Sequence, residues 1–311
     1  MAHSNRTLAM ILLSLLVTAG AVRADGLTGA SMRTLATSRG DLRGVAVGAP
    51  HDGYDTHTGK LLAALGERLE IGRVLARGYR SYRRGRFINV NRPTEKPRRR
   101  SGFGREAVTR RATKIYEEYQ SRLKAAARVE KGPLDLLVEI HGNSRKIVVE
   151  NRKVPLTVIE CATTGFTESE LRRLHREWRR LSADAGMPKL YFSGLDEHRR
   201  FVYRGVTCGF YYRATGTRKL GALRPEMASH GLHFELPRAL RFDEAARGRF
   251  VKVLAELIKD ARKIAGRGDG ELLPDEPKPA PKPPEDEEKA APGEPKSPED
   301  DGPGEDDPDE Q

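Results

Sequence analysis

The stretch APHDGYDTHTG, which begins at Ala49, places two histidines and two aspartates within seven residues. It follows the apolar run RGVAVGAP, which predicts a buried strand that ends at a proline. Catalytic zinc commonly binds two histidines and one carboxylate and keeps one position for water. We therefore expect His51 and Asp55 to be metal ligands. Asp52 and His57 remain alternatives to Asp55, although Asp before Gly is also common in turns.

Three later apolar runs, FINVNRP, LLVEIHGN and LHFELP, also carry polar side chains at or near their carboxyl ends. In open α/β sheets, ligands collect in the crevice beyond the carboxyl ends of the strands. The sequence therefore predicts one site at this edge of a sheet, formed by His51, Asp55, Asn91, Arg92, His141 and Glu235.

These residue types suit hydrolysis at a metal ion. His51, Asp55 and His141 supply the usual ligand set of a catalytic Zn²⁺. Such an ion lowers the pKa of its bound water to about 7 and polarises a carbonyl. The carboxylate of Glu235 could then take the proton of the water and pass it to a leaving amine.

The remaining polar residues of these strand ends suit substrate binding and support. Asn91 and Arg92 offer an amide beside a forked cation, which fits a substrate carboxylate. Glu139 lies two residues before His141, so it shares that face of its strand and could orient the ligand. The same rule places His233 beside the expected base, where it is either a supporting residue, which we favour, or a fourth candidate ligand.

The rest of the chain alternates strand-like with helix-like segments. The expected strands span residues 43–50, 73–79, 86–93, 134–143, 146–152, 156–163, 189–194, 205–212 and 231–237, and the expected helices span 58–70, 104–130, 167–186 and 243–265. Thr167 and Glu170 fit a capping box at the start of the third helix. This alternation predicts a single α/β domain with helices on the faces of the sheet.

Both ends of the chain differ in composition from this middle part. Residues 1–24 have the layout of a secretory signal peptide cleaved after Ala24, which predicts export to the periplasm or the outside of the cell. Residues 25–40 are interpreted as a linker, 41–266 as the catalytic domain and 267–311 as a disordered acidic, proline-rich tail.

The charge of the chain is unevenly distributed. Residues 268–311 hold 17 acidic side chains and 4 lysines, whereas the whole chain has a net charge of +12, so the remainder is about +25. A basic body could bind an anionic polymer of the cell envelope. Tyrosines interleave the basic run RGYRSYRRGR, but no recognised nucleic-acid motif accompanies it. The state of Cys161 and Cys208 and the oligomeric state stay open.

The motifs resemble those of the N-formylglutamate amidohydrolase-like family, in particular a bacterial branch of it. The resemblance spans residues 44–264 and rests on the stretches APHDGYDTHTG, RFINVNRPTE, ATKIYEEYQSRL, LDLLVEIHGN and ALRPEMASHGLHFELPRALR. This family is related to zinc carboxypeptidases and aspartoacylases. The resemblance implies a mixed, mostly parallel sheet of the phosphorylase/hydrolase type and one catalytic zinc.

The resemblance also implies roles for individual residues. His51 and His141 would bind zinc, and Glu235 would be the general base. Asn91 and Arg92 would hold the carboxylate of the substrate. Tyr54 stands where the carboxypeptidase spacing has a carboxylate, so Asp55 would have to replace it.

Two functions follow as expectations. The first is an exported, zinc-dependent amidohydrolase or carboxypeptidase-like hydrolase that cleaves an amide next to a free carboxylate, in an N-acyl amino acid or a peptide. The alternative is a catalytically degenerate protein that keeps the fold and binds an anionic envelope polymer or nucleic acid through its basic surface.

Overall fold

The computed structural model describes residues 27–81, 84–99 and 102–266. The predicted signal peptide and the predicted acidic tail lie outside the described residues. No helix within the described ranges is long and apolar enough to cross a membrane.

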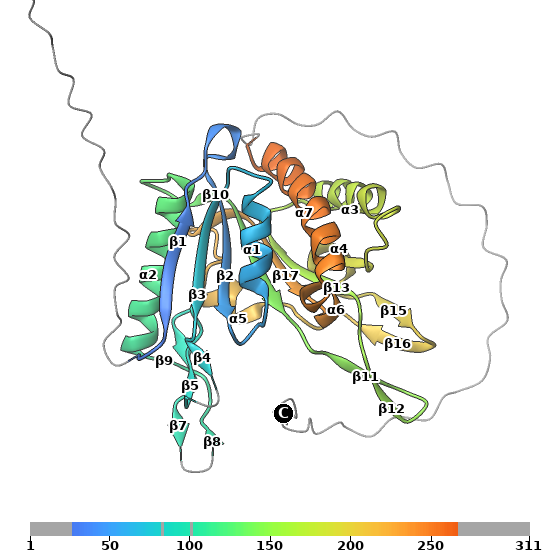
Figure 1. Ribbon diagram of the computed structural model, residues 1–311, viewed down its shortest axis with the longest axis horizontal. Coiled ribbons are helices and arrows are strands. Elements are labelled where there is room, and N and C mark those ends of the chain that lie inside the picture. The colour runs from blue at the N-terminus through green and yellow to red at the C-terminus, as the bar shows by residue number, and fades with distance from the viewer. Residues whose placement is uncertain (1–26, 82–83, 100–101, 267–311) are drawn as a thin grey trace, which may run out of the picture. The chain divides into compact units, whose positions relative to one another are not determined.

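A seven-stranded sheet forms the centre of the domain (Figure 1). Its strands in spatial order are β1 (Ser31–Ala36), β3 (Gly72–Arg77), β2 (Val45–Asp52), β10 (Leu134–Gly142), β17 (Ala228–Leu236), β13 (Ile159–Thr164) and β14 (Leu190–Phe192). The β1–β3 and β13–β17 pairings are antiparallel, and the other neighbouring strands are parallel. The predicted mixed, mostly parallel sheet is therefore confirmed.

Helices cover both faces of this sheet, as predicted (Figure 1). Alternate residues of β2 belong to two different hydrophobic clusters, because successive side chains of a strand point to opposite faces. Val45 and Val47 pack in the cluster of α1 (Thr58–Gly66), α3 (Glu168–Ser182) and α7 (Glu244–Ala265). Ala46 packs on the other face, against α2 (Arg110–Ala127).

Local sequence signals set the starts of two of these helices. Thr167 and Glu170 form the predicted capping box at the start of α3. The helix predicted from residue 104 begins only at Arg110, because β9 (Ala107–Val108) pairs with β6 (Thr94–Glu95) and Thr109 caps the helix.

Short elements connect the sheet and its helices. They are the hairpin strands β4 (Arg80–Ser81), β5 (Arg86–Phe87), β7 (Arg98–Arg99), β8 (Gly102–Phe103), β11 (Lys146–Val149), β12 (Arg152–Pro155), β15 (Arg200–Tyr203) and β16 (Val206–Gly209), with the helices η1 (Gly40–Leu42), α4 (Ser193–Asp196), α5 (Thr215–Leu220) and α6 (Arg238–Phe242).

The structure corrects two of the expected segments. The segment interpreted as a linker, 25–40, contains the edge strand β1, and Met32 anchors it with an exposed fraction of 1%. The strand expected at 86–93 is limited to Arg86 and Phe87, because its partner β4 is only two residues long. Residues 88–93 contribute an isolated bridge at Ile88 instead and carry Asn91 into the interior.

Cys161 and Cys208 are both buried and free.

Candidate metal centre

The carboxyl ends of β2, β10 and β17 lie side by side, because the three strands are parallel neighbours. The β10–β17 register pairs His141 with Glu235 and Glu139 with His233. His51 is contributed by the end of β2, and Asp55 by the turn that follows it.

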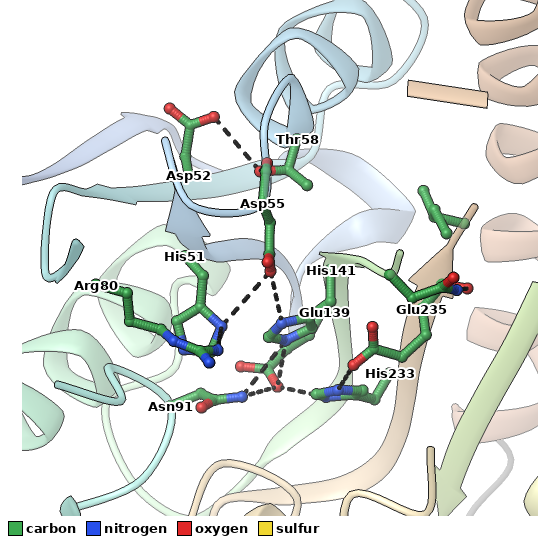
Figure 2. Close-up of polar contacts among 12 residues, drawn as sticks. His51, Asp52, Asp55, Thr58, Arg80, Asn91, Glu139, His141, His233 and Glu235 are labelled. Carbon is green, nitrogen blue, oxygen red and sulfur yellow. Dashed lines mark hydrogen bonds and ion pairs between the residues drawn. The ribbon is translucent and has the colours of Figure 1, made fainter. Parts of the chain in front are cut away.

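His51, Asp55 and His141 form a compact group of potential metal ligands (Figure 2). Oδ2 of Asp55 lies 3.2 Å from Nδ1 of His141 and 3.6 Å from Nδ1 of His51. Two ligands about 2.0–2.1 Å from a tetrahedral ion lie about 3.3–3.4 Å apart, so these separations fit one ion. The two imidazole rings meet at 67°, which allows lone pairs from different directions to converge.

Burial and mutual contacts set the charges of this group. Burial opposes ionisation of Asp55, but its contacts with His141 and His51 hold the pKa of its carboxyl well below the usual range. Burial and the nearby Arg80 lower the pKa of His51 to about 3. Burial would also lower the pKa of His141, but the carboxylates of Asp55 and Glu139 raise it to about 10. The group therefore contains one carboxylate, one neutral imidazole and one imidazolium at neutral pH.

The two alternatives to Asp55 lie outside this group. The Asp52 carboxylate accepts hydrogen bonds from the backbone of Gly59 (2.9 Å) and from Nε of Arg77 (2.5 Å), so it holds the start of α1. His57 precedes α1 with a φ of 70°, and its Nδ1 lies 3.2 Å from the carbonyl oxygen of Arg241.

A second group of potential ligands consists of Glu139, His141 and His233. The two imidazole rings are stacked, with centres 4.0 Å apart and planes 21° apart. Lone pairs in nearly parallel planes do not converge on one ion. Glu139 also accepts hydrogen bonds from Asn91 Nδ2 (3.0 Å) and from the hydroxyl of Tyr119 (3.2 Å). This second group is therefore better described as a buried hydrogen-bond network than as a second metal centre.

Glu235 lies beside this network with 12% of its side chain exposed. Its Oε1 is 3.4 Å from Nε2 of His233. Across the sheet it pairs with Glu160, whose carboxylate accepts hydrogen bonds from Arg145 and from the backbone of Tyr211. Glu235 is thus the partly accessible carboxylate of this strand end.

The side chains expected to hold a substrate carboxylate have other partners in this structure. The guanidinium of Arg92 binds Glu106 through two hydrogen bonds of 2.6 and 2.9 Å. Nδ2 of Asn91 donates to Glu139 and also lies 3.4 Å from Nε2 of His141. Asn91 therefore contacts the Nε2 side of His141, away from Asp55. Arg92 would have to give up Glu106 to bind a substrate carboxylate.

Arg80 is the cation that contacts the group directly. Its Nη1 lies 3.2 Å from Nδ1 of His51, and its guanidinium carbon lies 4.2 Å from the ring centres of both Tyr54 and Phe87. Because an arginine N–H donates here, Nδ1 of His51 is the acceptor nitrogen of the ring, and a metal ion bound at Nδ1 would have to displace Arg80 from this lone pair. Nε2 of His51 is buried with no hydrogen-bond partner within the described part of the chain.

Arg80 and Tyr119 are site residues that the sequence does not single out. Arg80 belongs to a run of similar arginines, in which charge alone does not distinguish one from the next. Tyr119 lies on the apolar face of α2, where a buried tyrosine usually signals only the core. Its polar hydroxyl, which needs a buried partner, is the one available signal.

No protein-family model matches the sequence, and no curated protein matches it. Among solved structures, the chain is similar to a gene product of Agrobacterium tumefaciens, with 15% identity, coverage of 74% of this chain and 93% of that one, and a TM-score of 0.40. A bacteriophage poly-gamma-glutamate hydrolase has 14% identity, coverages of 76% and 88%, and a TM-score of 0.38. A metallo-carboxypeptidase from Burkholderia cenocepacia has 13% identity, coverages of 76% and 60%, and a TM-score of 0.36. At this similarity the chemistry has to be inferred from the side chains of the site.

Proposed function

We propose that this protein is an exported zinc-dependent hydrolase of the carboxypeptidase-like kind, which cleaves an amide bond next to a free carboxylate. One observation carries the proposal: two imidazole nitrogens and a carboxylate oxygen from separate parts of the chain lie within 4.8 Å of one another, and Glu235 is the register partner of His141 on the neighbouring strand. The resemblance of the motifs to the N-formylglutamate amidohydrolase-like family points to the same reaction.

Each residue of the site would have its own role in the hydrolysis. His51, Asp55 and His141 would hold the ion, which would supply Lewis-acid activation of water and of the substrate carbonyl. Glu235 would accept the proton of the attacking water and deliver it to the nitrogen of the leaving amine. Arg80, a permanent cation beside His51, would stabilise the negative charge that develops on the carbonyl oxygen.

Substrate recognition would need a second cation besides Arg80. Arg92 is half-buried and held by Glu106, so a carboxylate of the substrate could replace Glu106 on the same planar fork. An N-acyl amino acid and the carboxyl end of a peptide both carry such a free carboxylate.

Export would be tested by sequencing the N-terminus of the mature protein, which we expect at Asp25.

The experiment combines metal analysis with turnover. Wild type reconstituted with zinc should hold about one ion per chain and hydrolyse N-acyl amino acids or peptides. Glu235→Gln should retain the ion and lose about 100-fold or more in kcat, within the usual range for general-base catalysis. If reconstituted wild type binds no zinc and Glu235→Gln turns over as fast as wild type, the proposal is wrong.

The alternative function is binding of an anionic envelope polymer by a degenerate site. Exposed arginines around β7 and the start of α2 favour it, among them Arg98, Arg105 and Arg110. Salt-sensitive polymer binding that survives His51→Ala and His141→Ala, in a protein without turnover, would support this function over hydrolysis.

A further inference from the structure

Glu139, His233 and Glu235 form a chain of contacts that links the candidate ligands to the candidate base (Figure 2). Nδ1 of His233 lies 3.0 Å from Oε2 of Glu139, and Nε2 of the same ring lies 3.4 Å from Oε1 of Glu235. The register of β10 and β17 places these residues opposite one another, so the chain of contacts is built into the sheet.

Glu139 is the rigid end of this series of contacts. Its exposed fraction is 0%, and it accepts hydrogen bonds from Tyr119 and Asn91 in addition to His233. A buried carboxylate with three donors from different elements has little freedom to rotate.

The imidazole of His233 is constrained twice. Glu139 fixes one of its nitrogens, and the ring stacks on His141 with centres 4.0 Å apart. Its second nitrogen therefore presents a fixed hydrogen-bonding group to Glu235. The same network contacts the back of His141, whose Nε2 lies 3.7 Å from Oε2 of Glu139.

We propose that His233 is a positioning residue, which ties the carboxylate of Glu235 to the buried anchor Glu139 and so fixes it relative to the ligand His141. This inference rests on the proposed function of Glu235. A base must lie within hydrogen-bond reach of the proton it takes, and a displacement of about 1 Å can cost 100-fold in rate. The network would set that distance by holding ligand and base on one support.

Two substitutions separate the contact of His233 with Glu139 from its contact with Glu235. In His233→Asn, the side-chain amide can reach the position of Nδ1, which keeps the contact with Glu139 and loses the one with Glu235. In His233→Gln, the longer amide can reach the position of Nε2, which keeps the contact with Glu235. We expect kcat to fall about 10–100-fold in His233→Asn and to recover in large part in His233→Gln, with KM little changed.

Metal affinity and a distant histidine provide the controls. Zinc affinity should change by less than about tenfold in both variants, since the stacked ring of His233 is not a ligand. His175→Gln alters a half-buried histidine of α3 whose ring contacts Phe192, and it should leave kcat unchanged. Loss of the bound zinc in both variants, or equal loss of kcat in the two, would overturn the inference.

A measurement without turnover separates this inference from the proposed function. Thermal unfolding of the metal-free wild type, His233→Asn, Glu235→Gln and the double variant gives a mutant cycle for the contact. We expect non-additive shifts in Tm. Additive shifts would contradict the positioning role, even if the enzyme is active. Non-additive shifts would support the positioning role, and a failure of the same protein to bind zinc would then contradict only the proposed function.

Discussion

The hydroxyl of Tyr119 occupies the space beside Gly48 that any side chain would fill. A β-carbon added to Gly48 would lie 1.9 Å from this oxygen and 3.0 Å from the ring carbon that bears it. Gly48 is also the register partner of Glu139, the carboxylate to which Tyr119 donates. The glycine is therefore required by packing, and it lets the Tyr119 side chain of α2 cross β2 on the same face of the sheet and reach Glu139, the buried anchor of the site.

Gly48→Ala should destabilise the protein and loosen the site. The added methyl forces the hydroxyl of Tyr119 away from Glu139, and we expect a loss of about 1–3 kcal/mol, the usual cost of overpacking. Urea denaturation of the metal-free protein measures it. The double variant Gly48→Ala/Tyr119→Phe removes the oxygen that clashes, so it should lose less stability than the sum of the two single variants. A fully additive pair would contradict this account of the glycine.

Substitution of the candidate ligands should separate Asp55 from its alternative His57. His51→Ala, Asp55→Ala and His141→Ala each remove a donor of the group, and we expect zinc affinity to fall by at least 100-fold in each. His57→Ala removes a ring held by a backbone carbonyl, so it should keep zinc. Metal content after dialysis against a chelator is the measurement. Retention of zinc by Asp55→Ala together with its loss from His57→Ala would reverse the assignment.

Zinc binding should release about one proton from His141 at pH 7, apart from any released by water bound to the ion. His141 has a pKa raised to about 10, so it is protonated in the metal-free protein and must lose its proton to become a ligand. His51 has a pKa near 3 and is already neutral. Because the deprotonated form binds, affinity should rise with pH, by about 100-fold between pH 6 and pH 8. Calorimetry in buffers of different ionisation enthalpy counts the proton, and a count of zero would exclude an imidazolium at His141.

The same group should make the metal-free protein less stable in alkaline solution. The folded pKa of His141 lies above its ordinary value of 6.5, so its contribution is complete below about pH 6.5 and disappears as the pH rises through 10. Denaturant unfolding of wild type and His141→Gln between pH 6 and pH 10 tests this. The difference in unfolding free energy between the two proteins should shrink as the pH rises. A constant difference would contradict the raised pKa.

The sequence predicts the parts of the fold and site that depend on local pattern. Branched apolar runs predict the central strands, and the capping box predicts the start of α3. His51 and His141 could be predicted to approach each other because the ends of parallel neighbouring strands always do. The role of Asp55 as a candidate ligand could be predicted from the histidines and aspartates of the turn that follows β2.

The remainder depends on contacts between distant segments. The sequence of β1 predicts a linker rather than a strand, because its pairing with β3 depends on the sheet edge and not on its own composition. The sequence predicts Asn91 at a strand end, but Asn91 enters the site on an irregular segment, where its side chain donates a hydrogen bond to Glu139. Arg80 reaches His51 because Tyr54 and Phe87 hold its guanidinium, and no spacing along the chain encodes that geometry.

Arg80 and Arg92 should differ in what they contribute to turnover. Arg80 lies against a candidate ligand and has no carboxylate partner within the described residues, so its charge is available to a developing oxyanion. Arg80→Met should lower kcat about 100-fold, as loss of an oxyanion donor does in other hydrolases. Arg92 is paired with Glu106, so Arg92→Met should mainly raise KM, and only for substrates with a free carboxylate. Steady-state kinetics on an N-acyl amino acid and on its carboxamide distinguish the two. An unchanged kcat in Arg80→Met would mean that this cation only packs on the two rings, and equal effects of Arg92→Met on both substrates would remove it from carboxylate recognition.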